Sequence, residues 1–309
     1  LQMRQEKKVI LLAGPTASGK SGLAIKIANY FNGEIINADS MQIYKEISIL
    51  TSKPNLKDTK IIKHHLYGFS SVRNKFSTGD WLKMTIKKIE ELWIKQKTPV
   101  IVGGTGLYFK ALTDGLVRIP NISNNVRTDV RNLHKKIGQK KFFIQLIKID
   151  PQAKKFLSSS DSQRSIRAYE VKKYTSKSLF DFIKETKLNF NKNVFIKLFI
   201  NTPREILNKK IEKRVEKMFK EEVIKEVKFF FKMKVDKNLS SNKIIGIKEI
   251  HDYLHGKISL IKAKDLIKQK TRQYAKRQFT WARGHMKSWE MIYSSDLNDL
   301  FKKVINKIS

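Results

Sequence analysis

A phosphate-binding pattern lies near the start of this 309-residue chain, where residues 14–21 read GPTASGKS. The run fits G-x-x-x-x-G-K-[ST], in which glycines let backbone N–H groups close around phosphate oxygens. Lys20 would neutralise a terminal phosphate, and the Ser21 hydroxyl would be a ligand for Mg²⁺. The pattern predicts a polyphosphate site without saying which polyphosphate it holds. The predicted phosphate-binding residues are Gly14, Pro15, Thr16, Ala17, Ser18, Gly19, Lys20 and Ser21.

An acidic residue that could work with this loop is Asp39, which follows the apolar run EIINA. Hydrolases with such a loop usually carry an apolar strand that ends in Asp, which supports Mg²⁺ and water. The candidate strand PVIV instead runs into Gly103, Gly104 and Thr105. Because the carboxyl ends of parallel strands meet at one edge of a sheet, we expect Asp39 near the loop, as a base or a metal support. A turn or N-cap role for Asp39 is the alternative.

The elements that must position these residues alternate between strand and helix patterns. Short apolar runs predict strands, and apolar positions at helical spacing predict helices. The predicted strands are 8–13, 34–38, 99–102 and 193–200, and the predicted helices include 18–31 and 81–95. Strand, glycine-rich loop and helix follow one another in the order that the phosphate motif requires. We therefore predict an α/β protein with a P-loop NTPase-like parallel sheet flanked by helices.

Beyond Pro120 the sequence becomes polar, with helical spacing up to about residue 189. A strand pattern then returns. We predict a discontinuous core domain, 1–120 and 190–309, interrupted by a helical insertion domain, 121–189.

A long helix is predicted from residue 202 to about 234. Thr202 would be its N-cap, Pro203 its first residue and Glu205 its third. Arg214 falls at the edge of the apolar stripe, where it either extends outward or meets a buried anion. The C-terminal third is predicted to be helical throughout.

The charge balance points to a polyanionic partner. The chain has 64 Lys+Arg against 28 Asp+Glu, a formal net charge of +36, which favours nucleic acid. A composition rich in Lys and Asn could alone produce part of this excess. The chain contains no Cys, which excludes disulfides and thiolate metal sites. Its apolar runs are too short for a membrane span. We expect a cytoplasmic protein without a membrane partner.

Several further blocks appear in a fixed order. They are DSMQIYKEISILTSKP (39–54), HHL (64–66), GGTGLYFKAL (103–112), DSQRSIRAYE (161–170), IIGIKEI (244–250) and TRQYAKRQFTWARGH (271–285). Together with the phosphate loop and Arg214, this series resembles the bacterial tRNA dimethylallyltransferases, or tRNA isopentenyltransferases, of the IPP transferase family. The resemblance covers the chain from Val9 to about His285.

The resemblance implies a reaction. The family transfers a dimethylallyl group from dimethylallyl diphosphate to N6 of the adenine next to the anticodon, at tRNA position 37, and requires Mg²⁺. The loop would then hold a prenyl diphosphate. The exocyclic amine of adenine is a poor nucleophile, and Asp39 would take its proton as the C–N bond forms. Thr16 and Arg214 resemble the family's residues at the substrate and the diphosphate, so the implied catalytic residues are Asp39, Thr16 and Arg214.

The RNA contacts also rest on the resemblance, supported by residue chemistry. Arg can pair with phosphate, Gln can read a base edge, and the target adenine must be extruded from its loop. The implied tRNA-binding residues are Asp39, Ser40, Met41, Gln42, Thr105, Arg127, Gln163, Arg164, Ser165, Ile166, Arg167, Lys243, Lys248, Arg272, Lys276, Arg277 and Arg283. Most aromatics of the 271–285 block are expected in the core. The partners would be a tRNA anticodon stem-loop and dimethylallyl diphosphate, with a monomer as the default.

Three alternatives remain open at this point. A nucleotide kinase would share the loop, an adenylate isopentenyltransferase would prenylate a free nucleotide, and a basic RNA-binding ATPase would explain loop and charge together. The kinase lacks support from the RNA-like blocks, and the free-nucleotide enzyme would need neither the insertion nor the 271–285 block. The sequence leaves open which tRNAs react and whether ATP binds.

Overall fold

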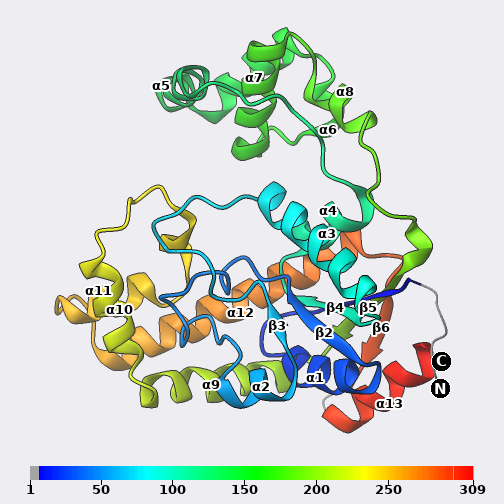
Figure 1. The fold of residues 1–309 in the computed structure, drawn as a ribbon. Coiled ribbons are helices and arrows are strands. Elements are labelled where there is room, and N and C mark those ends of the chain that lie inside the picture. The colour runs from blue at the N-terminus through cyan, green and yellow to red at the C-terminus, as the bar shows by residue number, and fades with distance from the viewer. Residues whose placement is uncertain (1–6, 295, 309) are drawn as a thin grey trace. The chain divides into compact units, whose positions relative to one another are not determined.

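The computed structural model describes residues 7–294 and 296–308. Two compact units divide the chain. The larger one joins the residues up to Thr113 with those from Phe190 onward, and the smaller one is Asp114–Asn189 (Figure 1). The first seam lies a few residues before the predicted boundary at 121, because α4 ends at Asp114 and no helix follows until α5 begins at Asn124.

A six-stranded parallel sheet forms the centre of the larger unit, in the order β3-β2-β4-β1-β5-β6. Its strands are β1 (Val9–Ala13), β2 (Gly33–Asn37), β3 (His64–His65), β4 (Thr98–Gly103), β5 (Phe195–Asn201) and β6 (Glu290–Tyr293). All five residues of β1 are buried, which explains why it reads as one continuous apolar run. The predicted α/β fold with a parallel sheet is therefore confirmed.

Helices cover both faces of this sheet. α1 and α13 lie on one face and α3 and α4 on the other (Figure 1). The helices of the larger unit are α1 (Lys20–Tyr30), α2 (Leu56–Ile61), α3 (Thr78–Ile94), α4 (Gly106–Asp114), α9 (Arg204–Lys220), α10 (Val223–Lys232), α11 (Ile247–Leu254), α12 (Leu260–His285) and α13 (Leu297–Ile308), with a 3₁₀ turn η2 (Ser240–Lys243). The sheet core includes Ile10, Leu12, Leu23 and Ile27.

The predicted long helix from 202 to 234 is wrong in its continuity. It is two helices, α9 and α10, separated at Glu222, whose φ of 62° is left-handed. Because of this break, Val223, Val227 and Phe230 are buried in a second core, to which the segment after β2 also contributes. The free energy gained by burying these side chains exceeds that of continuing one helix. No local stop signal marks the break, so the sequence pattern does not show it.

The predicted cap of α9 is also wrong. Arg204 is the first helical residue and Pro203 the N-cap, and no side chain caps this end. The hydroxyl of Thr202 instead donates to the carbonyl of Ser18 at 3.5 Å, so it contacts the phosphate loop.

The C-terminal third is not wholly helical, because β6 adds a sixth strand beside β5. Ile292 of β6 is buried in the sheet core, while Tyr293 is exposed. This half-exposed pattern is typical of an edge strand. A strand of four residues is too short for its pattern to be recognised between predicted helices.

The smaller unit consists of helices. They are α5 (Asn124–Ile149), α6 (Ala153–Phe156), α7 (Ser162–Thr175) and α8 (Leu179–Lys184), and a 3₁₀ turn η1 (Lys192–Val194) follows in the larger unit. A separate apolar cluster that includes Phe143, Leu146, Val171 and Phe180 holds the unit together. It therefore has a core of its own.

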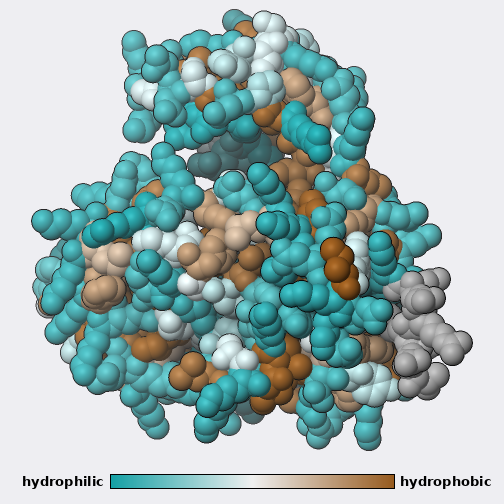
Figure 2. Space-filling view, viewed as in Figure 1, coloured by the Kyte–Doolittle hydropathy of each residue, from teal (hydrophilic) through white to brown (hydrophobic). Residues whose placement is uncertain are grey.

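Hydrophilic side chains cover most of the face seen in Figure 2. None of the described helices is both long enough and apolar enough to cross a membrane.

Candidate active site

The phosphate loop runs from β1 into α1 and takes its shape from two left-handed residues, Ala17 (φ 63°) and Gly19 (φ 92°). Gly19 is the N-cap of α1, so helical geometry begins at Lys20, two residues later than the sequence predicted. The loop therefore points backbone N–H groups and a helix N-terminus at the same place, which favours an anion. Ser18 is buried, and its Oγ has no hydrogen-bond partner among the described residues.

Lys20 lies at the bottom of this loop. Its Nζ donates to the carbonyl of Pro15 at 2.6 Å, which is a bond within the loop itself. Burial lowers the pKa of Lys20 to about 8; Asp39 opposes the shift and Arg214 adds to it. A half-buried ammonium group that donates to one carbonyl gains from meeting an anion.

Asp39 lies where the carboxyl end of β2 leaves the sheet, and Asn37 fixes its backbone. The Asn37 amide accepts from Asp39 N at 2.8 Å and donates to the carbonyls of Asp39 (3.0 Å) and Leu66 (2.9 Å). Oδ1 of Asp39 accepts from Met41 N at 2.9 Å. The carboxylate is thus held in a fixed turn facing the phosphate loop. Sequence reasoning missed Asn37, although a polar residue at the end of a buried strand is a readable signal.

Arg214 reaches the loop from α9. Its guanidinium donates to Thr16 Oγ1 at 2.7 Å, so two predicted catalytic residues are hydrogen-bonded to each other. Burial lowers the pKa of Arg214, and the charge of Asp39 opposes that shift. Its Nε has no partner among the described residues. The side chain therefore does not extend into solvent, and the partner to which it donates is a hydroxyl and not a buried anion.

These groups line one cavity of about 300 Å³. Thr16, Lys20, Asp39 and Arg214 all contribute to it, as does the exposed Ser21. Cations and backbone amides therefore converge on one side, and a carboxylate faces them. Such an arrangement can hold a polyphosphate and accept a proton beside it.

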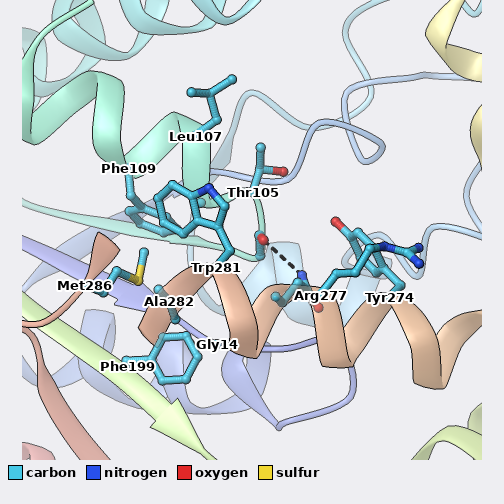
Figure 3. Close-up of a pocket in the computed structure, with 14 residues that line it drawn as sticks. Gly14, Thr105, Leu107, Phe109, Phe199, Tyr274, Arg277, Trp281, Ala282 and Met286 are labelled. Atoms are coloured by element: carbon cyan, nitrogen blue, oxygen red, sulfur yellow. Dashed lines mark hydrogen bonds between the residues drawn. The ribbon is translucent and has the colours of Figure 1, made fainter. Parts of the chain in front are cut away.

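A second cavity, of about 230 Å³, is lined in part by Gly104 and Thr105. Its walls are mainly apolar, and Figure 3 shows Phe109, Phe199, Trp281 and Met286 around it. Gly14 of the phosphate loop also lines it. An apolar cavity thus lies directly beside the polar one.

The DSMQ segment and Thr105 form the link between the two cavities. Ser40 N donates to Thr105 Oγ1 at 3.0 Å, and Thr105 N donates to the carbonyl of Ala38 at 3.1 Å. Gln42 Nε2 donates to the carbonyls of Thr51 and Ser52, so its side chain also shapes the loop. Met41 packs against the second core.

Helix α10 anchors that loop through hydrogen bonds. Glu226 accepts from Ile49 N at 2.8 Å and from Leu50 N at 3.0 Å. The break at Glu222 therefore has a consequence for the site, because it aims α10 at the segment that leads to Thr51 and Ser52.

The predicted RNA-contact residues of the larger unit lie mostly on its surface. Arg277 and Lys276 are exposed on α12, and Arg277 also lines the apolar cavity. Arg272 is 3.6 Å from Glu212 of α9. The others, all exposed, are Arg283, Lys243 and Lys248. Among the aromatics, Phe279 packs on Phe199, as expected, whereas Trp281 and Tyr274 line the apolar cavity.

The remaining predicted RNA contacts belong to the smaller unit. Gln163 is exposed, Arg164 lies 3.5 Å from Asp161, and Arg167 lies 3.4 Å from Glu170. Ile166 and Arg127 are half-buried. Ser165 is fully buried, and its hydroxyl donates to the carbonyl of Asp161 at 2.6 Å. Its side chain therefore has a structural role within the unit.

A magnesium ion would find few protein ligands here. The residues that the structure describes contain no group of three or more His, Cys, Asp or Glu that could hold a metal. The cavity does offer the Ser21 hydroxyl and the Asp39 carboxylate. Mg²⁺ prefers such hard oxygen ligands and usually keeps several waters beside substrate phosphates. The donor set fits Mg²⁺ bound mainly through a substrate.

His64 and His65 both have partners within the fold. His65 Nε2 lies 2.5 Å from Glu34, and His64 Nδ1 lies 2.7 Å from the carbonyl of Ile62. Burial lowers the pKa of both imidazoles.

Comparisons with known proteins give a consistent result. Residues 42–285 match the model of a family described as IPP transferase. The tRNA dimethylallyltransferase of Pelagibacter ubique (strain HTCC1062) is 53% identical over 302 residues, which cover 98% of this chain and 96% of that protein.

Two solved structures resemble the chain along nearly its whole length. The full-length tRNA isopentenylpyrophosphate transferase of Bacillus halodurans has a TM-score of 0.71 at 29% identity, covering 98% of this chain and 96% of that one. A eukaryotic dimethylallyltransferase acting on tRNA has a TM-score of 0.84 at 27% identity, covering 98% of this chain and 78% of that one.

Proposed function

The chain belongs to the IPP transferase family, and on this premise we infer that it is a tRNA dimethylallyltransferase. It transfers a dimethylallyl group from dimethylallyl diphosphate to N6 of the adenine at tRNA position 37. The observation that carries this assignment is the single cavity in which Lys20, Arg214 and the phosphate loop face Asp39. A leaving diphosphate and a base are the two things that the reaction requires.

In the proposed mechanism the diphosphate lies against the loop amides and Lys20, with Arg214 and Thr16 beside it. N6 of adenine attacks the allylic carbon, the C–N bond forms, and the allylic C–O bond breaks. The electron pair of that bond leaves with the diphosphate, whose growing negative charge Lys20 and Arg214 stabilise. Asp39 accepts the proton that N6 loses.

The apolar cavity beside the loop supports the prenyl half of this assignment. Because Gly14 lines it and the phosphate loop continues into the polar cavity, a molecule with a charged head and an apolar tail fits across the two. We propose that the tail of the prenyl diphosphate lies against these apolar walls, which exclude water from a carbon with partial cation character.

We propose that Mg²⁺ accompanies the diphosphate. Ser21 would be its protein ligand and the carboxylate of Asp39 would lie nearby. When bound, the ion would neutralise part of the charge that develops on the leaving group.

The tRNA side of the proposal is supported by charge. Exposed cations on α12, with Arg277 at the mouth of the apolar cavity, could follow the phosphates of an anticodon stem-loop. The formal net charge of +36 favours such a partner. The basic residues of the insertion, Arg127, Arg164 and Arg167 among them, would add further contacts.

The test is one incubation of the protein with Mg²⁺, labelled dimethylallyl diphosphate and unmodified tRNA, run beside AMP and beside labelled ATP. Label should enter tRNA, and a tRNA with guanine at position 37 should stay unlabelled because guanine lacks the N6 amine. Label in AMP would favour a free-nucleotide transferase. ATP hydrolysis without prenyl transfer would reject the assignment.

We expect affinity for the diphosphate to fall as pH rises through about 8, the value to which burial lowers the pKa of Lys20. Below that pH the side chain is an ammonium and attracts the diphosphate. Above it the free protein loses this charge, so binding must be accompanied by proton uptake. Calorimetric titration with inorganic diphosphate, in buffers of different ionisation enthalpy, measures both effects.

The matched control is Lys20→Arg, which stays charged and should lose the pH dependence even if its affinity is lower. An affinity of the unaltered protein that does not change between about pH 7 and 9 would contradict the role of Lys20 titration.

A further inference from the structure

Gln278 is a buried polar residue of α12 that lines the apolar cavity, and the mechanism above does not use it. Its Oε1 accepts from Thr16 N at 2.8 Å. Its Nε2 donates to the carbonyl of Gly104 at 2.9 Å, a bond drawn as a dashed line in Figure 3. Both polar atoms of this amide are therefore paired, and its orientation is fixed, because an N–H must face an acceptor and a carbonyl a donor.

The backbone around Gly104 packs closely against α12. A Cβ on Gly104 would overlap Nε2 of Gln278, and a Cβ on Gly106 would overlap the indole of Trp281. α12 is thus seated directly on the loop between β4 and α4, at a distance that only glycine permits. The Gln278 side chain is therefore a fixed link between Thr16 and Gly104, and we call this link the strut.

The strut joins the two halves of the site. On one side, Thr16 also accepts from Arg214 at 2.7 Å. On the other, Gly104 is followed by Thr105, whose hydroxyl accepts from Ser40 N at 3.0 Å, and Ser40 follows Asp39. A continuous set of bonds therefore runs from the diphosphate side, through Gln278, to the base side.

We propose that Gln278 is a positioning residue that sets the spacing between the bound diphosphate and the adenine-facing loop. The proposal rests on the proposed function, since it assigns the two sides of the strut to the two substrates. Gln278 itself need not touch either substrate. Because a displacement of about 1 Å at a reacting centre can cost about 10²-fold in rate, a strut between two substrate loops has a direct effect on the chemical step.

The experiment compares Gln278→Met with Gln273→Met. The first keeps side-chain volume and removes both hydrogen bonds, and the second is a matched change at an exposed position of the same helix. The readouts are the single-turnover transfer rate at saturating substrates, tRNA affinity and melting temperature. We expect Gln278→Met to lose about 10- to 100-fold in rate with tRNA affinity within about threefold, and Gln273→Met to match the unaltered protein.

A second variant, Gln278→Glu, tests the bonds themselves and serves if Gln278→Met folds poorly. A carboxylate still accepts from Thr16 N but repels the carbonyl of Gly104. A protonated carboxylic acid restores both bonds. The rate of Gln278→Glu relative to the unaltered protein should therefore rise as pH falls, which a merely structural residue would not produce.

Three results would overturn the proposal. A Gln278→Met rate equal to that of the unaltered protein would remove the positioning role while leaving the transferase assignment intact. A loss of tRNA affinity as large as the loss of rate would show that Gln278 is instead an RNA contact. If the unaltered protein transferred no label to tRNA, the proposed function and this role would fall together.

Discussion

Replacement of Asp39 by asparagine should lower the single-turnover rate of prenyl transfer by about 10²- to 10⁴-fold. The substitution keeps Oδ1 as an acceptor for Met41 N, so the turn after β2 should hold its shape. It removes the carboxylate that we propose accepts the N6 proton. Rapid-quench measurement with saturating tRNA and labelled dimethylallyl diphosphate would give the rate, and filter binding would give tRNA affinity, which should stay within a few-fold.

Asp265→Asn is a suitable control, because Asp265 is an exposed carboxylate on α12 whose nearest cation, Lys268, is 3.9 Å away. It should leave both quantities unchanged. A transfer rate for Asp39→Asn within a few-fold of the unaltered protein would place the base elsewhere. Loss of tRNA binding with intact chemistry at saturation would make Asp39 a binding residue.

Arg214→Met should lower the rate by about 10²- to 10³-fold, the usual effect of removing one group that stabilises charge in the transition state. The effect should be on the chemical step, because Arg214 donates to Thr16 Oγ1 of the phosphate loop, where we propose that the diphosphate binds. Arg214→Lys should fall between, since it keeps the charge and loses the planar fork.

The stability of Arg214→Met, in contrast to its rate, should stay equal or rise. Burial lowers the pKa of Arg214, so holding this cation inside the protein costs free energy. An apolar side chain of similar length should leave the melting temperature equal or higher. Arg204→Met, at the exposed start of the same helix, should change neither rate nor stability. A melting temperature that falls together with the rate would indicate that Arg214 acts mainly in folding.

The parts of this site that the sequence could reveal are those set by local patterns. The phosphate loop is contiguous, and its neighbouring strand and helix follow within a few residues. The position of Asp39 followed from a general rule for parallel sheets. Arg214 could be marked as unusual because α9 has a regular apolar stripe, which the burial of Leu207, Ile211 and Val215 bears out.

The parts that it could not reveal depend on residues far apart in the chain. Gln278 meets Thr16 across 262 positions and Gly104 across 174, and no local pattern distinguishes it from the exposed Gln273. The break at Glu222 is similar, because the packing of Val223 and Phe230 decides it. β6 needs β5 as a partner before its four residues have any reason to be extended.

The helical unit lies in the sequence between two strands of the sheet, and this order has a consequence for how the protein is synthesised. β1 pairs with β4 on one side and with β5 on the other, and the helical unit is encoded between β4 and β5. At ordinary translation speeds the roughly 90 residues between those strands take about 5 to 20 s to emerge. Throughout that interval the nascent chain carries an apolar strand with one open edge, which is prone to pair wrongly. The helical unit has a core of its own, so it can fold during this interval. It can therefore be folded before β5 emerges and pairs with β1.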